Sequence, residues 1–124
     1  MQDEPTLTEL IKAVADFLRT EITPAIKGHN AFKLRVGINA LDLVTRQLTL
    51  EEGSDAREVE RLRALLGIDG SVGDLNRALA ERIAKGDVDL TTPGLAEHLW
   101  QTTMDKLAVD QPNYASYKRE LGTK

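Results

Sequence analysis

The sequence predicts an all-α protein in which residues 1–124 form a single domain, a bundle of five to six helices around a buried central helix. Two observations favour this class. Apolar residues recur at three- and four-residue spacing along most of the chain, which is the helical period. Signals for helix starts and stops return about every twenty residues. No segment alternates with the period of two that a half-buried strand requires, so no sheet is expected.

The first helix is expected from about Leu7 to Thr23, with Thr6 as its N-cap, and Pro24 either ends it or tightens its last turn. Its apolar stripe consists of Leu7, Leu10, Ile11, Val14, Phe17, Leu18 and Ile22. Glu21 falls inside this stripe, in the last turn, where the helix dipole disfavours an anion. Either Glu21 is buried and paired with an arginine of the next helix (Arg35 or Arg46), or the helix end frays and leaves Glu21 exposed.

The second helix, about residues 30–50, carries apolar side chains around most of its circumference, which predicts a buried central helix. Its one narrow polar strip consists of Arg35, Asn39, Asp42 and Arg46. This strip has two interpretations. Arg35, Asn39 and Arg46 could bind the carboxylate or phosphate of an acidic ligand, because guanidinium groups offer paired donors to such anions. Alternatively, the strip belongs to a structural ion-pair network with Asp42 and with acidic residues of other helices, namely Glu21, Asp105 or Asp110.

The remaining helices are expected at about residues 55–66, 72–85 and 93–109, followed by a short helix after Pro112. Asp55, Ser71 and Thr92 each stand where an N-cap belongs, and Pro93 would occupy the first helical position. The glycines at positions 67 and 86 mark the ends of two of these helices.

Composition excludes several classes of function. The net charge is −4 and basic residues form no stripe, so nucleic-acid binding is not expected. The chain has no cysteine, which excludes disulfides and thiolate metal sites and suits the cytoplasm. The acidic segment Met1–Pro5 is unlike a secretory signal, and no stretch approaches the ~20 apolar residues of a membrane span, so a soluble cytoplasmic protein without membrane contact is expected.

The only candidate for catalysis is the pair His98 and Asp105, seven residues apart and therefore on one helical face. Such a pair could act as metal ligands or as a base and the group that orients it. The other interpretation is a solvated polar face, since no third ligand follows at a suitable spacing and no nucleophile motif is present. We therefore expect no catalytic residues, no metal and no cofactor.

Two segments, Phe32–Leu41 continuing to Arg46, and His98–Tyr114, are similar to an uncharacterised bacterial all-helical family, a domain of unknown function. Its members are generally stand-alone proteins encoded near aminoglycoside-phosphotransferase-like kinases and acyl-CoA dehydrogenases. The resemblance implies a role in acyl-CoA metabolism or beside such a kinase, and it implies no catalytic residues.

Two functions follow as hypotheses. The first is a non-catalytic accessory or interaction protein whose partner is a phosphotransferase-like kinase or an acyl-CoA dehydrogenase; a homodimer is compatible with it. The alternative is a small-molecule binding module that holds a carboxylate or acyl-CoA ligand at Arg35, Asn39 and Arg46.

Overall fold

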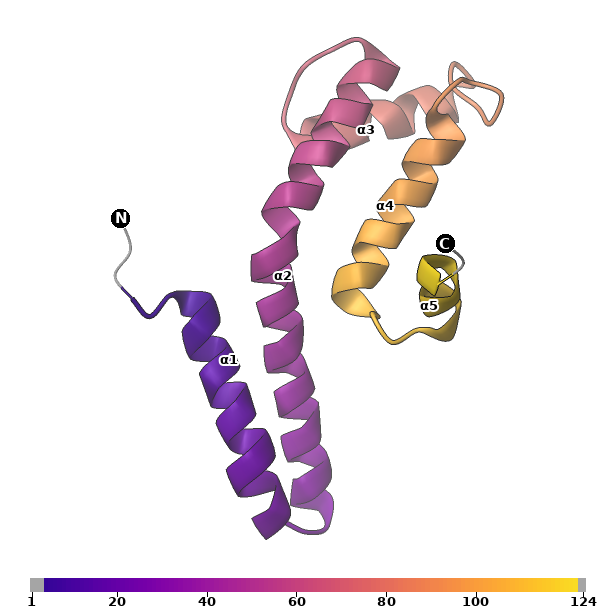
Figure 1. Ribbon diagram of the computed structural model, residues 1–124. Coiled ribbons are helices and arrows are strands. Elements are labelled where there is room, and N and C mark those ends of the chain that lie inside the picture. Colours follow the sequence, from indigo (N-terminus) through magenta and orange to yellow (C-terminus); the bar gives the residue numbers. More distant parts are fainter. Residues whose placement is uncertain (1–3, 123–124) are drawn as a thin grey trace. The chain divides into compact units, whose positions relative to one another are not determined.

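The computed structural model describes residues 4–122, so Met1–Asp3 of the acidic N-terminal segment and the last two residues lie outside it. All regular structure in this range is helical (Figure 1), which confirms the all-α class. The elements are α1 (Leu7–Phe17), a π-helical turn η1 (Leu18–Ile22), a 3-10 turn η2 (Thr23–Ala25), α2 (His29–Leu66), α3 (Val72–Ala84), α4 (Leu95–Asp110) and α5 (Ala115–Gly122). None of the helices in this range is both long and apolar enough to cross a membrane.

Three of the predicted helix ends are confirmed. The Thr6 hydroxyl accepts a hydrogen bond from the Glu9 backbone N–H at 3.2 Å, and Ser71 caps α3 in the same way through Asp74 at 3.1 Å. Gly67 ends α2 with a φ of 69°, a conformation that glycine adopts without steric cost. The cap predicted at Thr92 is wrong: its hydroxyl accepts from the Asp89 backbone N–H, and Gly94 holds the N-cap position of α4.

The two helices predicted for residues 30–50 and 55–66 are one continuous helix of 38 residues, so the N-cap predicted at Asp55 is wrong. Gly53 lies inside this helix and does not adopt a positive φ. A single glycine costs a helix about 1 kcal/mol relative to alanine, which the good helix formers on either side offset. The segment also lacks a proline, the residue that would have ended the helix.

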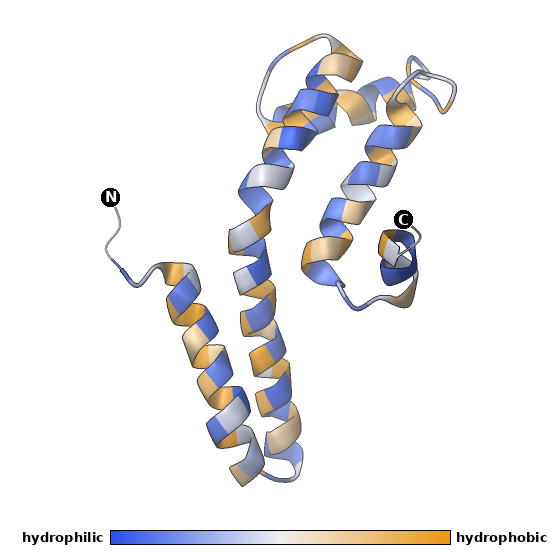
Figure 2. Ribbon diagram, in the orientation of Figure 1, coloured by the Kyte–Doolittle hydropathy of each residue, from blue (hydrophilic) through white to orange (hydrophobic). Residues whose placement is uncertain are grey.

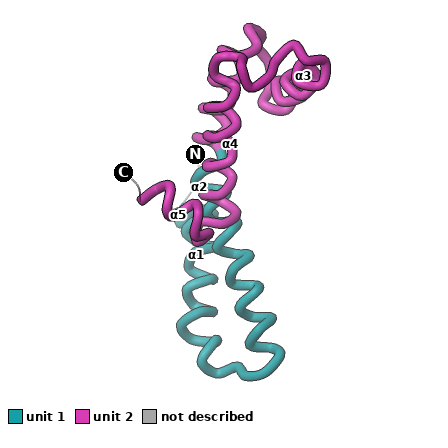
Figure 3. The backbone as a smooth tube through the Cα atoms, turned by 90° about the vertical axis from the view of Figure 1, so that its right-hand side faces the viewer, with its two compact units in different colours: residues 1–51 teal, residues 52–124 magenta. Residues whose placement is uncertain are grey.

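Contacts group the chain into two compact units, residues 1–51 and 52–124, and α2 contributes to both (Figure 3). The single domain expected for residues 1–124 stays a prediction. In the first unit, α1 lies antiparallel beside the first half of α2, as Figures 1 and 3 show. Ala15 and Ile38 are the buried apolar residues described there.

The prediction that residues 30–50 form a buried central helix is wrong. Of its apolar side chains only Ile38 is buried, whereas Phe32, Val36, Val44 and Leu48 are about half exposed. A helix that is apolar nearly all round needs neighbours on every side. Among residues 4–51 only α1 and the turns that follow α1 are available to cover it, and Figure 2 shows the apolar residues distributed along both helices.

The second unit has the larger core. It consists of Leu62 and Leu66 from α2, Leu75 and Leu79 from α3, Val88 from the following loop and Leu95 from the start of α4. Arg82 of α3 donates a hydrogen bond to the carbonyl of Leu66 at 3.0 Å, which satisfies one of the free carbonyls at the end of α2. This core holds the second half of α2 and the start of α4 in fixed positions.

Candidate functional site

In the polar strip of the first half of α2, the contacts of Arg35 and Asp42 are with different partners. The guanidinium of Arg35 lies 5.9 Å from the ring centroid of Phe32, a cation–π arrangement. Asn39 is exposed, Arg46 is half-buried, and Asp42 is paired with Arg19 of η1 at 2.6 Å. The structure therefore engages Asp42 in an ion pair, whereas an acidic-ligand site at Arg35, Asn39 and Arg46 stays a prediction.

Glu21 is exposed and forms no ion pair with any residue in the range 4–122, so the pairing with Arg35 or Arg46 does not form. The exposed side of the helix explains this. Glu21 follows Phe17, which is 54% exposed, by four residues and lies on the same side, whereas Leu18 and Ile22 lie on the covered side. In the π-helical turn between them the Thr23 backbone N–H bonds to the carbonyl of Leu18, five residues earlier, instead of four.

A row of alternating charges links α1, η1 and α2. Lys12 pairs with Asp16 at 3.0 Å, Asp16 with Arg19 at 3.0 Å, and Arg19 with Asp42. The hydrogen bond from Lys12 lowers the pKa of the Asp16 carboxyl, and Arg19 lowers it further. The row fixes the flank of the α1–α2 hairpin in the first unit.

The apolar stripe of α1 divides into two seams. Ile11, Ala15, Leu18 and Ile22 are covered, and they are spaced four, three and four residues apart. Leu7, Leu10, Val14 and Phe17 are between 47% and 59% exposed. Their spacing of three, four and three residues is the a/d spacing with which one helix packs along another. We call these four residues the outer seam.

A polar network joins α2 and α4 in the second unit, and Arg61 is its centre. Arg61 Nε donates to Nδ1 of His98 at 3.1 Å, and Arg61 Nη2 donates to the Thr102 hydroxyl at 3.3 Å. The same Nη2 lies 4.0 Å from Oδ2 of Asp105, and Arg57 Nη2 lies 3.9 Å from Oδ1. Helical spacing in the sequence singled out His98 and Asp105 but not Arg57, Arg61 and Thr102.

His98 is 2% exposed, so the interpretation of its helical face as solvated is wrong. Burial lowers the pKa of the imidazole, and the charge of Arg61 lowers it further, while Glu58 acts in the opposite direction. Because an arginine is always a donor, Nδ1 must carry the lone pair, and the proton of the neutral ring sits on Nε2. His98 is thus a neutral side chain that still has one N–H to donate.

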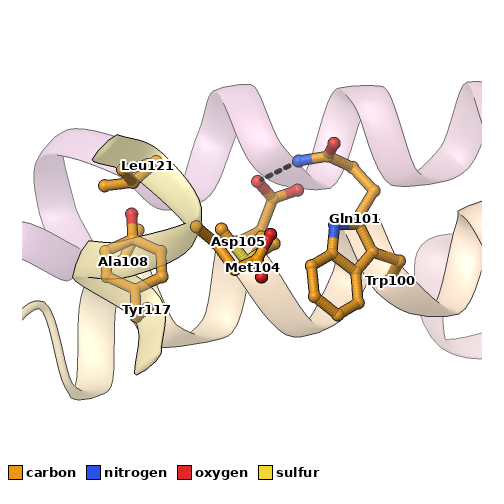
Figure 4. Close-up of a pocket in the computed structure, with 8 residues that line it drawn as sticks. Trp100, Gln101, Met104, Asp105, Ala108, Tyr117 and Leu121 are labelled. Carbon is orange, nitrogen blue, oxygen red and sulfur yellow. Dashed lines mark hydrogen bonds between the residues drawn. The ribbon is translucent and has the colours of Figure 1, made fainter. Parts of the chain in front are cut away.

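Asp105 bridges this network and a hollow between α4 and α5. Its Oδ1 accepts a hydrogen bond from Gln101 Nε2 at 3.1 Å, whereas the buried Oδ2 has no hydrogen-bond partner among residues 4–122. The hollow has a volume of about 490 Å³ and is lined by Trp100, Gln101, Met104, Asp105, Ala108, Tyr117, Glu120 and Leu121 (Figure 4). In the second unit it separates the indole of Trp100 from the phenol of Tyr117.

Within residues 4–122 no group of three or more histidine, aspartate or glutamate side chains is arranged to hold a metal ion. His98 and Asp105 share Arg61 as a neighbour and are not hydrogen-bonded to each other. The pair therefore does not have the geometry of a base and its orienting carboxylate.

Comparison with protein families gives one match, over residues 24–114, to the domain of unknown function DUF6285. No curated protein and no solved structure matches the chain. The matched segment begins at η2 and ends just before α5, so it contains the whole of α2, the Arg61 network and the core of the second unit. Because the match covers more than half of the chain, this protein belongs to the DUF6285 family.

Proposed function

We propose that this protein is a non-catalytic accessory protein of the cytoplasm that binds a helix of a partner protein along the outer seam of α1. The observation that carries the proposal is the exposure of Leu7, Leu10, Val14 and Phe17 at coiled-coil spacing. Exposed apolar side chains in a continuous row mark interaction surfaces, because removing apolar area from water is favourable.

The spacing also indicates the kind of partner. A seam of a/d positions is complementary to the ridges of another helix, which inserts its own apolar side chains between those of the seam. Phe32, Val36, Val44 and Leu48 of α2 offer further apolar surface in the same unit. A docked partner helix would complete the helical bundle that the sequence predicts around residues 30–50.

The partner class comes from the family resemblance of Phe32–Arg46 and His98–Tyr114, which implies a phosphotransferase-like kinase or an acyl-CoA dehydrogenase. The test is co-expression of the tagged chain with each of these enzymes, taken from the genome that encodes the chain, followed by co-purification. We expect one of them to copurify in a fixed ratio. The Leu10→Glu variant should abolish copurification, because it places a carboxylate in the middle of the seam.

Leu90→Glu is the matched control, since it introduces the same charge at a leucine that is 75% exposed in a loop of the other unit. Light scattering of the chain alone tests the competing occupant, a second copy. A dimer that Leu10→Glu dissociates, with no enzyme retained, would make the outer seam a homodimer interface and refute the accessory role.

The alternative function, an acidic-ligand module, depends on Arg35, Asn39 and Arg46. Calorimetry with acyl-CoA and with simple carboxylates tests it, and the Arg46→Ala variant should then lose the heat of binding. The contact of the Arg35 guanidinium is with the ring of Phe32 on the same helix, which does not itself indicate a ligand, so we place this function second.

A further inference from the structure

A second, smaller hollow of about 220 Å³ lies in the second unit at the start of α4. Arg61, His98, Gly94 and the acidic Glu97 contribute its polar groups, and Ala64, Leu65 and Pro93 form its apolar wall. The outer seam of α1 has no part in it. It is also distinct from the 490 Å³ hollow, which lies farther along α4 and shares none of these residues.

Hydrogen-bond donors without protein partners collect around this hollow. Nδ1 of His98 accepts from Arg61, so the unpartnered Nε2–H belongs to a side chain that is almost completely buried and lines the hollow. Arg61 uses Nε and Nη2 in the network, and its Nη1 forms no hydrogen bond with residues 4–122.

The start of α4 supplies further donors. Gly94 is its N-cap and has no side chain with which to cap the helix, and the Leu95 N–H bonds to the carbonyl of Thr92. Among residues 4–122 no acceptor is present for the next two backbone N–H groups, those of Ala96 and Glu97. The positive end of the helix dipole thus adds to the charge of Arg61.

The apolar wall indicates which anion fits. A volume of 220 Å³ corresponds to about seven water molecules, which is room for a small organic ion. Inorganic phosphate would leave Ala64, Leu65 and Pro93 facing an ion that prefers water on every side. A carboxylate with a short aliphatic chain satisfies the donors at one end and covers the apolar wall with the other.

From the neutral donor His98, the cation Arg61 and the uncapped start of α4, we propose that this hollow is a binding site for short-chain monocarboxylates. The carboxylate accepts hydrogen bonds from His98 Nε2, Arg61 Nη1 and the first-turn N–H groups of α4. The Glu97 carboxylate also lines the hollow and opposes the ligand electrostatically, so it weakens binding and limits the site to weakly bound anions.

The test is an NMR titration of the full chain with butyrate at pH 7 and constant salt. We expect saturable shifts of the Ala96 and Glu97 amide signals. Glu97→Gln should tighten binding about threefold, the effect of removing one like charge several ångström away in water. Ala64→Glu should weaken binding at least about tenfold, because it places a carboxylate inside the hollow.

A control variant shows whether butyrate binds at this hollow and not elsewhere on the chain. Ala80→Glu adds the same charge at an exposed position of α3 and should leave butyrate binding unchanged. The proposal is overturned by shifts that do not saturate, by unchanged affinity in Ala64→Glu, or by butylamine or inorganic phosphate binding more tightly than butyrate.

Discussion

Replacing Arg61 with methionine tests whether the network between α2 and α4 stabilises the second unit. Methionine retains most of the unbranched apolar stem and removes the guanidinium. The variant loses the hydrogen bond from a charged donor to buried His98, which contributes about 1.5–3 kcal/mol, and the longer bond to Thr102, about 0.5–1 kcal/mol. The contact with Asp105, at 4.0 Å, adds less than about 1 kcal/mol. We expect the free energy of unfolding to fall by about 2–4 kcal/mol.

The matched control is Arg57→Met. Arg57 stands four residues earlier on the same helix, its side chain is 62% exposed, and its only described polar contact is the 3.9 Å ion pair with Asp105. The same substitution should therefore cost less than about 1 kcal/mol there. Urea unfolding followed by circular dichroism measures both variants at a common denaturant slope.

A stabilising role for Arg61 is refuted if Arg61→Met unfolds within about 0.5 kcal/mol of the wild type, or if the two variants are equally destabilised. A long-range proton–nitrogen NMR spectrum of the wild type is an independent check. It should show the His98 proton on Nε2, and a proton on Nδ1 would contradict the hydrogen bond from which the expected loss is calculated.

Three further predictions concern stability. Replacing Leu62, which is 0% exposed, with alanine should lower the free energy of unfolding by about 2–5 kcal/mol. Leu90→Ala should lower it by less than about 0.5 kcal/mol, and urea unfolding compares the two variants. The folded pKa of His98 lies below its unfolded value of about 6.5, so the unfolded chain binds the proton first as the pH falls. The contribution of His98 to the free energy of unfolding should therefore be complete when the pH is above the unfolded pKa, and should decline below it by at most about 1.4 kcal/mol per pH unit. The His98→Leu variant should show a flatter decline in urea titrations at about pH 5–7. Ser71→Ala removes the cap of α3 and should lower the melting temperature by the equivalent of about 1 kcal/mol, with Ser116→Ala as the control; equal melting temperatures would contradict the cap.

Helix ends were predictable from the sequence where the signal is local chemistry. A hydroxyl at Thr6 or Ser71 satisfies a backbone N–H three residues later, and this needs no other part of the chain. Gly67 likewise ends α2 through its own backbone conformation. The helix break predicted near Asp55 failed because a glycine and a capping residue only permit a helix to end there. They do not compel it.

The burial of individual helices was not predictable, because it depends on which other helices pack against each of them. The pattern of α1 predicts one wide stripe, but of that stripe the structure covers only Ile11, Leu18 and Ile22, together with Ala15. The π-helical turn of residues 18–22 was equally hidden. Nothing in the composition of residues 18–22 distinguishes that turn from an ordinary one.

The Arg61 network does leave a signal in the sequence. His98, Thr102 and Asp105 are spaced four and three residues apart and thus share a face of α4, while Arg57 and Arg61 are four apart on α2. Two complementary polar rows on separate helices are consistent with pairing across an interface. The pairing itself still requires the core around Leu62 and Leu95 to bring residues 61 and 98 together.

The alternating row of Lys12, Asp16, Arg19 and Asp42 has a consequence for recognition. At about 100° per residue, Lys12, Asp16 and Arg19 lie on the side of α1 and η1 away from the outer seam. Two cations and two anions neutralise one another there, so this side of the α1–α2 hairpin presents almost no field to an approaching molecule. The row thus offers a partner of the outer seam no electrostatic guidance, and these four charges should not make its association rate depend on the concentration of sodium chloride.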